Sequence, residues 1–203
     1  MTPSPPPSPS RTAGPPAGLA RFNASARPDA AAALHEVCVC PEWAGGVLAG
    51  RPYPDAEALL AASDRAVAAL TPEQLARAVA GHPPIGRPRP GDPVSAGEQR
   101  GMTGAAAGLR AEMLELNLAY QRRFGHVFLI CATGLTAERM RDAVRLRIGN
   151  PPEREQEIVR TELAGINRLR LARLLTAVPG PADRPREERM SPRPGPPLRE
   201  ERA

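Results

Sequence analysis

One of the three histidines stands where a side chain could exchange protons with a ligand. His82 follows a segment of helical pattern and precedes two prolines, which fix the backbone at this point. Because the helix dipole favours a cation at a helix C-terminus, the position predicts a raised pKa for His82, suited to proton transfer near neutral pH. A general acid or base is one interpretation of His82, and a plain helix cap is the other.

A second group of candidates opens the next predicted helix. Ser95 and Glu98 have the spacing of a capping box, in which both side chains bind the free N–H groups of a helix start. The same helix end also favours anions, so this segment could instead bind an anionic substrate. Arg170, inside an amphipathic segment, is by default a solvated charge. The residues alone leave these alternatives open.

The other two histidines give weaker signals. His35, Cys38 and Cys40 could in principle offer three metal ligands, but on a helix Cys40 turns about 200° away from Cys38. No second ligand pair appears elsewhere, so we expect packing thiols and no metal site. His126, next to a helix-ending glycine, is expected to be a boundary residue.

The elements that must position these groups are predicted to be helices. Asp29, Asp55 and Thr71 are candidate N-caps, and Gln74 completes a capping box with Thr71 before Pro72. Trp43 is expected to anchor the core. The predicted helical ranges are 29–40, a short helix within 41–53 that ends near Gly50, 55–70, 71–81, a stretch beginning at 95–98 and ending at Gly125, 136–149 and 152–175.

Two segments depart from this helical pattern. Residues 82–99 are rich in proline and glycine and are predicted to form a loop that leads into the helix capped by Ser95. Residues 126–134 are the only strand-like run, but one short run without a partner cannot form a sheet, so it could be extended or helical. In the chain between these two segments, Leu109, Met113, Leu116 and Tyr120 have helical spacing. They predict a helix with one buried face. The sequence predicts a single all-α domain, an irregular bundle of about seven to nine helices.

Composition sets the limits of this domain within the 203 residues. Residues 1–18 and 177–203 hold many of the 26 prolines and few large apolar side chains. Such segments bury too little surface to offset the entropy of ordering. We therefore expect disordered Pro/Ser-rich and Pro/Arg-rich tails around a helical domain at 19–176.

The net charge of +5 and the pI near 10.0 raise the possibility of a nucleic-acid partner. The arginines of the predicted domain are spread among acids, with no one-sign stripe, aromatic interleaving or known binding module. We expect no nucleic-acid partner. We expect a cytoplasmic protein, because the number of cysteines is odd and no apolar run of signal-peptide length is present. We expect no membrane contact, because no run of about 18 apolar residues occurs.

Seven short motifs together resemble the 2-oxo-4-hydroxy-4-carboxy-5-ureidoimidazoline (OHCU) decarboxylases. Each motif alone is weak, but they occur in the family's order and cover about 22–175. They are F-N-A-S (22–25), W-A…G-R-P (43–52), G-H-P-P-I-G (81–86), S-x-x-E-Q-x-G (95–101), L-N-x-A-Y-x-x-R-F-G-x-x-F-x-x-C-A-T-G (116–134), G-N-x-P-E-x-E (149–155) and L-R-L (169–171).

The resemblance implies a cofactor-free, metal-free helical enzyme, usually a homodimer, that converts OHCU, a small ureidoimidazoline, to (S)-allantoin and carbon dioxide in urate degradation. It makes His82 the catalytic acid or base, and Glu98 catalytic or orienting. Arg170 becomes the buried cationic contact. Either Arg170 or backbone amides near 95–99 are expected to face ring or ureido oxygens, while Glu98 stays unneutralised and repels the leaving carboxylate. The implied substrate-binding residues are Pro83, Ser95, Ala96, Gly97, Gln99, Ile130, Cys131, Ala132, Thr133, Gly134 and Arg170.

Two departures from the family pattern affect local packing. Cys38-Val39-Cys40 stands where adjacent cysteines and a serine are common, and Pro84 stands where arginine is frequent. They keep open a degenerate relative without activity. A rival from another class is a non-catalytic helical interaction module whose basic tails contact RNA or an acidic partner.

Overall fold

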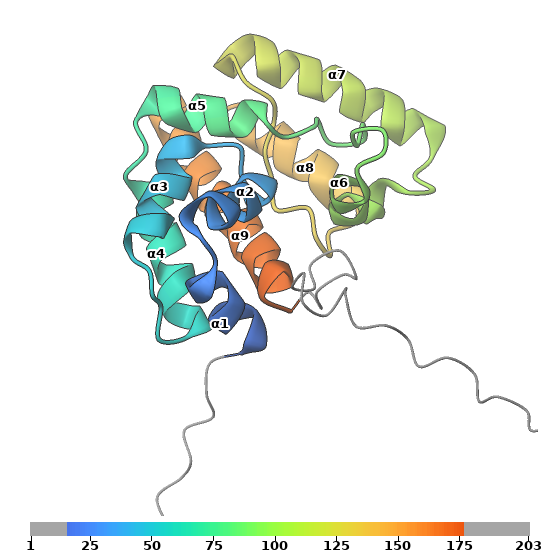
Figure 1. Cartoon of the computed structure of the whole chain (residues 1–203). Coiled ribbons are helices and arrows are strands. Elements are labelled where there is room, and N and C mark those ends of the chain that lie inside the picture. Colours follow the sequence, from blue (N-terminus) through green and yellow to red (C-terminus); the bar gives the residue numbers. More distant parts are fainter. Residues whose placement is uncertain (1–15, 177–203) are drawn as a thin grey trace, which may run out of the picture.

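The computed structural model describes residues 16–176, which form an all-helical domain (Figure 1). The predicted all-α class and helix number are confirmed, since the described residues contain nine α-helices, one short 3-10 helix and no strand. The elements are α1 (Ala17–Ala24), α2 (Arg27–Val37), α3 (Pro41–Ala49), α4 (Ala56–Ala68), α5 (Pro72–Ala80), α6 (Pro93–Glu98), η1 (Arg100–Met102), α7 (Ala107–Phe124), α8 (Ala137–Arg147) and α9 (Pro152–Thr176).

Both predicted tails lie almost wholly outside the described residues. The exception is at residues 16–18, because α1 begins at Ala17, slightly before the predicted start of the domain at residue 19. Gly18 is buried against the end of α9, where a Cβ would come within 1.8 Å of the Leu175 carbonyl oxygen. Close backbone approach therefore places the first residues of α1 inside the fold.

Two of the predicted N-caps, Asp55 and Thr71, are confirmed. The Asp55 carboxylate accepts a hydrogen bond from the Ala58 N–H at 2.7 Å, and Thr71 forms the predicted capping box with Gln74. The expected cap at Asp29 is wrong. Helix α2 begins at Arg27, with proline in its first turn, and Asp29 lies inside that turn, where a negative charge still suits the helix dipole.

Helix α9 runs through the middle of the domain and contacts α1, α2, α4 and α5 (Figure 1). Its buried side chains join those of α1–α5 in the larger of two apolar clusters. Trp43 is fully buried there, as predicted, and its indole N–H donates to the Ser63 hydroxyl at 3.1 Å. Burial of this apolar surface is the main force that assembles the helices on α9.

The second apolar cluster lies between α7 and α8 and the extended segment that joins them. Met113 and Tyr120, from the predicted stripe, are fully buried, whereas Leu109 and Leu116 are half-buried. Gly125 ends α7 with a φ of 79°, in the left-handed region where glycine is favoured. The stripe therefore predicts the buried side of α7 correctly.

The predicted helix start at Ser95 is wrong. Asp92 caps α6 by accepting from the N–H groups of Val94 and Ser95, and α6 ends at Glu98. The chain turns here because Gly101 packs against the Leu135 carbonyl oxygen, 1.9 Å from where a Cβ would lie. Gly104 has a φ of 77°, so the long helix begins only at Ala107.

Residues 127–132 are extended and pair with side chains in place of a neighbouring strand. The Leu129 carbonyl accepts from Arg147 Nη1 at 3.0 Å, and the Cys131 N–H donates to Glu162 Oε2 at 2.9 Å. Buried backbone groups need partners, and here α8 and α9 supply them. This pairing fixes the segment between the two apolar clusters.

A buried ion pair joins the start of α9 to the end of α8. Glu155 Oε1 accepts from Arg147 Nε and Nη2 at 2.9 and 2.7 Å and from the Tyr120 hydroxyl at 2.5 Å. Asn150 Nδ2 donates to Glu155 Oε2 at 2.7 Å, and the Arg147 guanidinium lies over the Phe128 ring. Both carboxylate oxygens of Glu155 thus accept hydrogen bonds, which is the condition under which a buried charge pair is tolerated.

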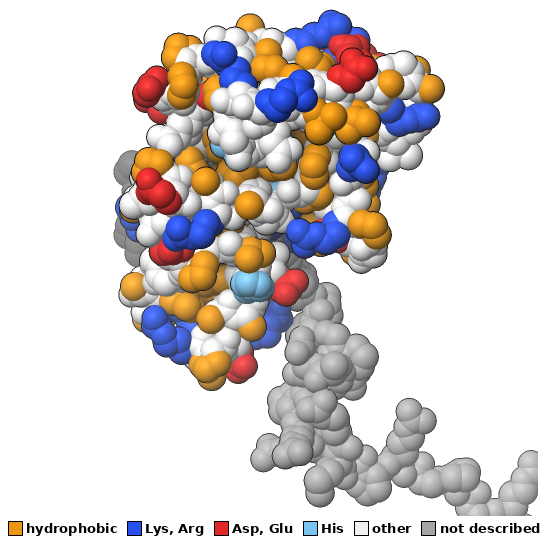
Figure 2. Space-filling view, turned by 90° about the horizontal axis from the view of Figure 1, so that it is seen from above, with side chains coloured by type: hydrophobic (Ala, Val, Ile, Leu, Met, Phe, Trp, Pro, Cys, Tyr) orange, Lys and Arg blue, Asp and Glu red, His pale blue; other side chains and the backbone are white. Residues whose placement is uncertain are grey.

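The exposed surface carries mixed charge. On the face in Figure 2, basic and acidic side chains are interspersed, with no continuous basic stripe. No helix among residues 16–176 combines the length and apolarity needed to cross a membrane.

Replacing one partner of the buried pair should strongly destabilise the domain. Glu155→Gln leaves Arg147 buried with much of its counter-charge removed, and we expect a loss of about 3 kcal/mol in the free energy of unfolding. Urea denaturation checks this. Glu157→Gln is the matched control on the same helix, because Glu157 pairs with Arg154 at the exposed surface and should cost under about 0.5 kcal/mol. Equal effects from both variants would contradict the assignment.

Candidate functional site

A pocket opens between the two apolar clusters and is lined by residues from four separated parts of the chain. Its empty volume is about 410 Å³ with the open mouth included. The predicted site residues that line it are His82, Pro83, Ser95, Glu98, Gln99, Ile130, Ala132, Thr133 and Arg170. The fold thus brings together the loop after α5, helix α6, the extended segment and α9.

His82 lies at the end of α5 with its ring held by that helix. Its ring Nδ1 is 3.1 Å from the Ala78 carbonyl oxygen, and its backbone N–H donates to Val79 at 2.9 Å. A carbonyl can only accept, so Nδ1 carries the hydrogen and Nε2 has a free lone pair. The side chain is buried, with 7% of its surface exposed, and Nε2 has no partner among the described residues.

The raised pKa predicted for His82 is wrong. Burial, together with the nearby positive charge of Arg170, lowers its pKa to about 4, although the Ala78 carbonyl and Glu98 act in the opposite direction. Desolvation penalises the cation more than the helix end stabilises it. His82 is therefore neutral at physiological pH in the substrate-free protein.

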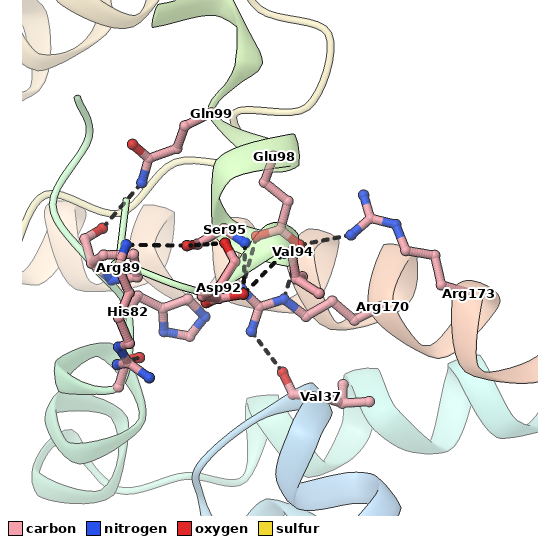
Figure 3. A network of polar contacts seen from close by, with 12 residues as sticks. Val37, His82, Arg89, Asp92, Val94, Ser95, Glu98, Gln99, Arg170 and Arg173 are labelled. Carbon is pink, nitrogen blue, oxygen red and sulfur yellow. Dashed lines mark hydrogen bonds and ion pairs between the residues drawn. The ribbon is translucent and has the colours of Figure 1, made fainter. Parts of the chain in front are cut away.

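Two arginines of α9 hold Glu98 (Figure 3). Arg170 donates from Nε and Nη2 to the two carboxylate oxygens, at 2.9 and 2.8 Å, and Arg173 donates from Nη1 at 3.0 Å. Arg170 Nη1 also donates to the Val37 carbonyl at 2.9 Å. All three donor atoms of Arg170 are thus engaged, which fixes the plane of the Glu98 carboxylate.

This network changes the expected roles of both groups. Burial opposes ionisation of Glu98, but the hydrogen bonds and charges of Arg170 and Arg173 outweigh it and hold its pKa below the usual range. The expectation that Glu98 stays unneutralised is wrong for this substrate-free state. Arg170 lines the pocket, as expected, but its guanidinium is already bonded to Glu98 and Val37, so its contact with substrate oxygens stays a prediction.

The side chains of Ser95 and Gln99 form hydrogen bonds with the backbone of the loop that follows His82. The Ser95 hydroxyl accepts from the Arg89 N–H at 3.3 Å, and Gln99 Oε1 accepts from the Gly86 N–H at 2.8 Å. Gln99 Nε2 lies 3.4 and 3.3 Å from the carbonyls of Pro83 and Pro84. Both side chains are buried, so α6 clamps this Pro-rich loop against the pocket. Pro84 forms part of that loop without occupying the pocket lining.

Four predicted substrate-binding residues do not line the pocket. They are Ala96, Gly97, Cys131 and Gly134. Cys131 is half-buried against Gly165 of α9 and packs with the larger apolar cluster, whereas its neighbours Ile130 and Ala132 belong to the smaller cluster and line the pocket. Ala96 is exposed on α6, and Gly134 is an exposed turn residue with a φ of 82°.

The sequence analysis missed several residues at the site. The apolar wall contains Ile85, Phe128, Leu129, Ile166 and Leu169. Arg173, the second cation on Glu98, was also missed. Its signal was its place three residues after Arg170, which puts both on one face of a helix.

The remaining candidate residues lie elsewhere. His35 is exposed, whereas Cys38 and Cys40 are buried free thiols, and burial raises the pKa of Cys38 to about 12. Within residues 16–176, no three His, Cys, Asp or Glu side chains are arranged to hold a metal ion. His126 is half-buried beside Tyr120 and Phe124, at the boundary where it was expected.

Two curated proteins are similar to the chain. It is 33% identical over 138 residues to 2-oxo-4-hydroxy-4-carboxy-5-ureidoimidazoline decarboxylase of Amia calva, covering 65% of this chain and 79% of that protein. It is 31% identical over 147 residues to uric acid degradation bifunctional protein TTL of Arabidopsis thaliana, covering 68% of this chain. The match spans 45% of the Arabidopsis protein, less than half of its length.

Solved structures and a family model extend these matches. An OHCU decarboxylase structure determined in the presence of (S)-allantoin has a TM-score of 0.63 and 26% identity, covering 70% of this chain and 96% of that one. A structure of (S)-allantoin synthase shares the fold, with a TM-score of 0.60 and 17% identity over 77% of this chain and 53% of that one. The model of the OHCU decarboxylase family matches residues 23–172. As its motifs predicted, the chain belongs to the OHCU decarboxylase family, a family of carboxy-lyases.

Proposed function

We propose that the chain decarboxylates OHCU to (S)-allantoin, with His82 as the group that moves protons. The observation that carries this proposal is the convergence of His82, Glu98 and Arg170 on one pocket, from segments far apart in the sequence. The solved relative crystallised with (S)-allantoin supports the product. The pocket network has one acid and two arginines, a net positive charge that suits an anionic substrate.

The substrate's groups define the proton transfers. OHCU carries a hydroxyl and a carboxylate on one ring carbon and a ureido group on the next. When carbon dioxide leaves, the electron pair of the broken C–C bond enters the ring. In allantoin the hydroxyl-bearing carbon has become a carbonyl, and the ureido-bearing carbon has gained a hydrogen. The reaction therefore removes one proton from the hydroxyl oxygen and delivers one to the ureido-bearing carbon on a single face. The ring nitrogen that receives the electron pair takes up one further proton from solvent, which balances the charge of the lost carboxylate.

His82 is suited to both transfers in this order. Its neutral ring presents Nε2 as an acceptor, while the Ala78 carbonyl fixes the hydrogen on Nδ1. Nε2 takes the hydroxyl proton, which makes the ring a cation. The cation is costly in this buried site, so it gives a proton readily to the adjacent carbon.

Glu98 acts as a fixed hydrogen-bond acceptor. Because its pKa is lowered, it stays ionised at neutral pH and cannot serve as the proton donor. Held by Arg170, it can accept from N–H groups of the ureidoimidazoline and so orient the ring toward His82. Delocalisation of the electron pair within the ring removes the need for an electron-sink cofactor, and we propose a cofactor-independent reaction.

Two further features follow from the resemblance and the composition. We propose a homodimer, which light scattering of the purified protein tests. We also propose a cytoplasmic location, supported by three free cysteines, two of them buried. The rival prediction of an interaction module rests on the terminal segments, which lie outside the described residues.

Loss of His82 should nearly abolish turnover. With OHCU generated from urate in place, the wild-type protein should form dextrorotatory allantoin faster than the spontaneous racemic decay. His82→Ala removes the proton shuttle, and we expect kcat to fall about 10²- to 10⁴-fold with the fold intact. His126→Ala is the matched control and should retain near-full activity. Full activity of His82→Ala would refute its role, and salt-sensitive RNA binding without OHCU consumption would support the interaction module.

Loss of the Glu98 charge should lower activity, because the substrate ring is then less well oriented toward His82. Glu98→Gln keeps the shape but weakens the contacts with Arg170 and Arg173, and we expect kcat/KM to fall about 10²-fold. Circular dichroism checks that the fold remains. Glu157→Gln, an exposed change of the same kind on α9, should leave kcat/KM unchanged.

The buried neutral His82 predicts a specific pH dependence of stability. Its pKa of about 4 lies below the ordinary value of 6.5. Between these values the unfolded chain binds the extra proton, so the free energy of unfolding falls as the pH drops from about 6.5 to 4, by up to roughly 3 kcal/mol. Urea unfolding at pH 7 and 4.5 should show a smaller fall for His82→Gln than for wild type. The same fall in both proteins would rule out a strongly lowered pKa.

A further inference from the structure

A second hollow adjoins the mouth of the pocket on the α6 side. It is lined by Pro93, Val94, Gly97, Arg100, Thr133 and Arg173. Thr133 also lines the pocket itself, and Arg173 reaches the pocket through its contact with Glu98. We call this hollow the vestibule. A ligand that enters from this side meets Arg100 and Arg173 before it meets Glu98.

The charge of the vestibule is one-sided. Two arginines line it and no carboxylate does. Inside the pocket, one Glu98 carboxylate faces both Arg170 and Arg173, which leaves one excess positive charge at the boundary between the two spaces. Such a charge raises the local concentration of anions and speeds their entry.

The two arginines on Glu98 differ in how firmly they are held. Arg170 makes two bonds to Glu98 and one to the Val37 carbonyl, and 14% of its side chain is exposed. Arg173 makes a single bond to Glu98, and 47% of its side chain is exposed. Arg170 alone can therefore keep Glu98 in place, and Arg173 can leave Glu98 at little cost.

We propose that Arg173, with Arg100 beside it, captures the carboxylate of the incoming substrate and exchanges its contact with Glu98 for this anion. The assignment rests on the proposed function for the identity of the substrate. A cation that grips the departing carboxylate would stabilise the ground state more than the transition state. Arg173 therefore acts in uptake, and its effect belongs in KM and in the association rate.

Steady-state kinetics at low and high salt test this role. At low ionic strength, Arg173→Gln should raise KM about tenfold with kcat within about twofold of wild type, as expected for a charge at the rim of a site. At about 0.5 M salt the difference in kcat/KM should shrink to under about threefold, because screening acts on exposed charges. Arg173→Lys keeps the positive charge, so its KM should be close to the wild-type value. Arg168→Gln is the matched control on α9, since Arg168 pairs with Glu57 and Asp64 of the α4 region.

Calorimetric binding of two non-reacting probes gives a readout apart from activity. One is 5-hydantoinacetate, which carries a carboxylate, and the other is neutral allantoin. We expect Arg173→Gln to weaken binding of the carboxylate probe about fivefold to tenfold at low salt and to leave allantoin binding unchanged. Equal weakening of both probes, or a lower kcat at constant KM, would show that Arg173 only positions Glu98. Selective loss of carboxylate binding in a protein that does not consume OHCU would uphold the vestibule and refute the proposed function.

Discussion

The ion pair between Glu98 and Arg170 is the interaction on which the architecture of the site depends. It joins α6, which follows a long Pro-rich loop, to the central helix α9. A third bond from Arg170 to the Val37 carbonyl ties in the end of α2. Because the guanidinium is planar and holds both carboxylate oxygens, it sets the orientation of α6 as well as its distance. The loop with His82 is then clamped by Gln99, the residue that follows Glu98.

The opposite wall of the pocket is formed by a segment whose backbone is hydrogen-bonded by side chains and not by a neighbouring strand. Residues 127–132 have no neighbouring strand among the described residues, and their backbone is paired instead by Arg147 and Glu162. Arg147 is itself fixed by Glu155, in the G-N-x-P-E-x-E turn that opens α9. A motif that does not line the pocket therefore acts on it through one charge network. Removal of Arg147 leaves Glu155 buried without a counter-charge, and removal of Glu155 takes away the closer of the two acidic partners of Arg147.

His82 shows how burial can reverse a local electrostatic argument. At the end of α5 its sequence position favours a cation, and the Ala78 carbonyl contributes in that direction. Burial and the charge of Arg170 act against the cation and prevail. The neutral ring presents an unprotonated Nε2 to the pocket, which suits removal of a hydroxyl proton. In the mechanism we propose, the neutral His82 ring takes up the proton, while Glu98, whose pKa is lowered by Arg170 and Arg173, accepts hydrogen bonds.

The amino-acid sequence by itself determined the all-helical class, the places of most helices, some of their caps and the family. Thr71, Asp55 and Gly125 act through neighbours within a few residues, so their roles can be read locally. The motifs also predicted a site with His82, Glu98 and Arg170, and the fold brings these three side chains to one pocket. Only the tertiary structure decided the ionisation and the hydrogen-bond partners of these side chains. The break after Glu98 comes from the packing of Gly101 against Leu135, and the pairing of Glu98 with Arg173 comes from contact between α6 and α9. The low pKa of His82 likewise depends on burial by distant segments, because desolvation and ion pairing are set by neighbours in space, which local sequence patterns do not specify.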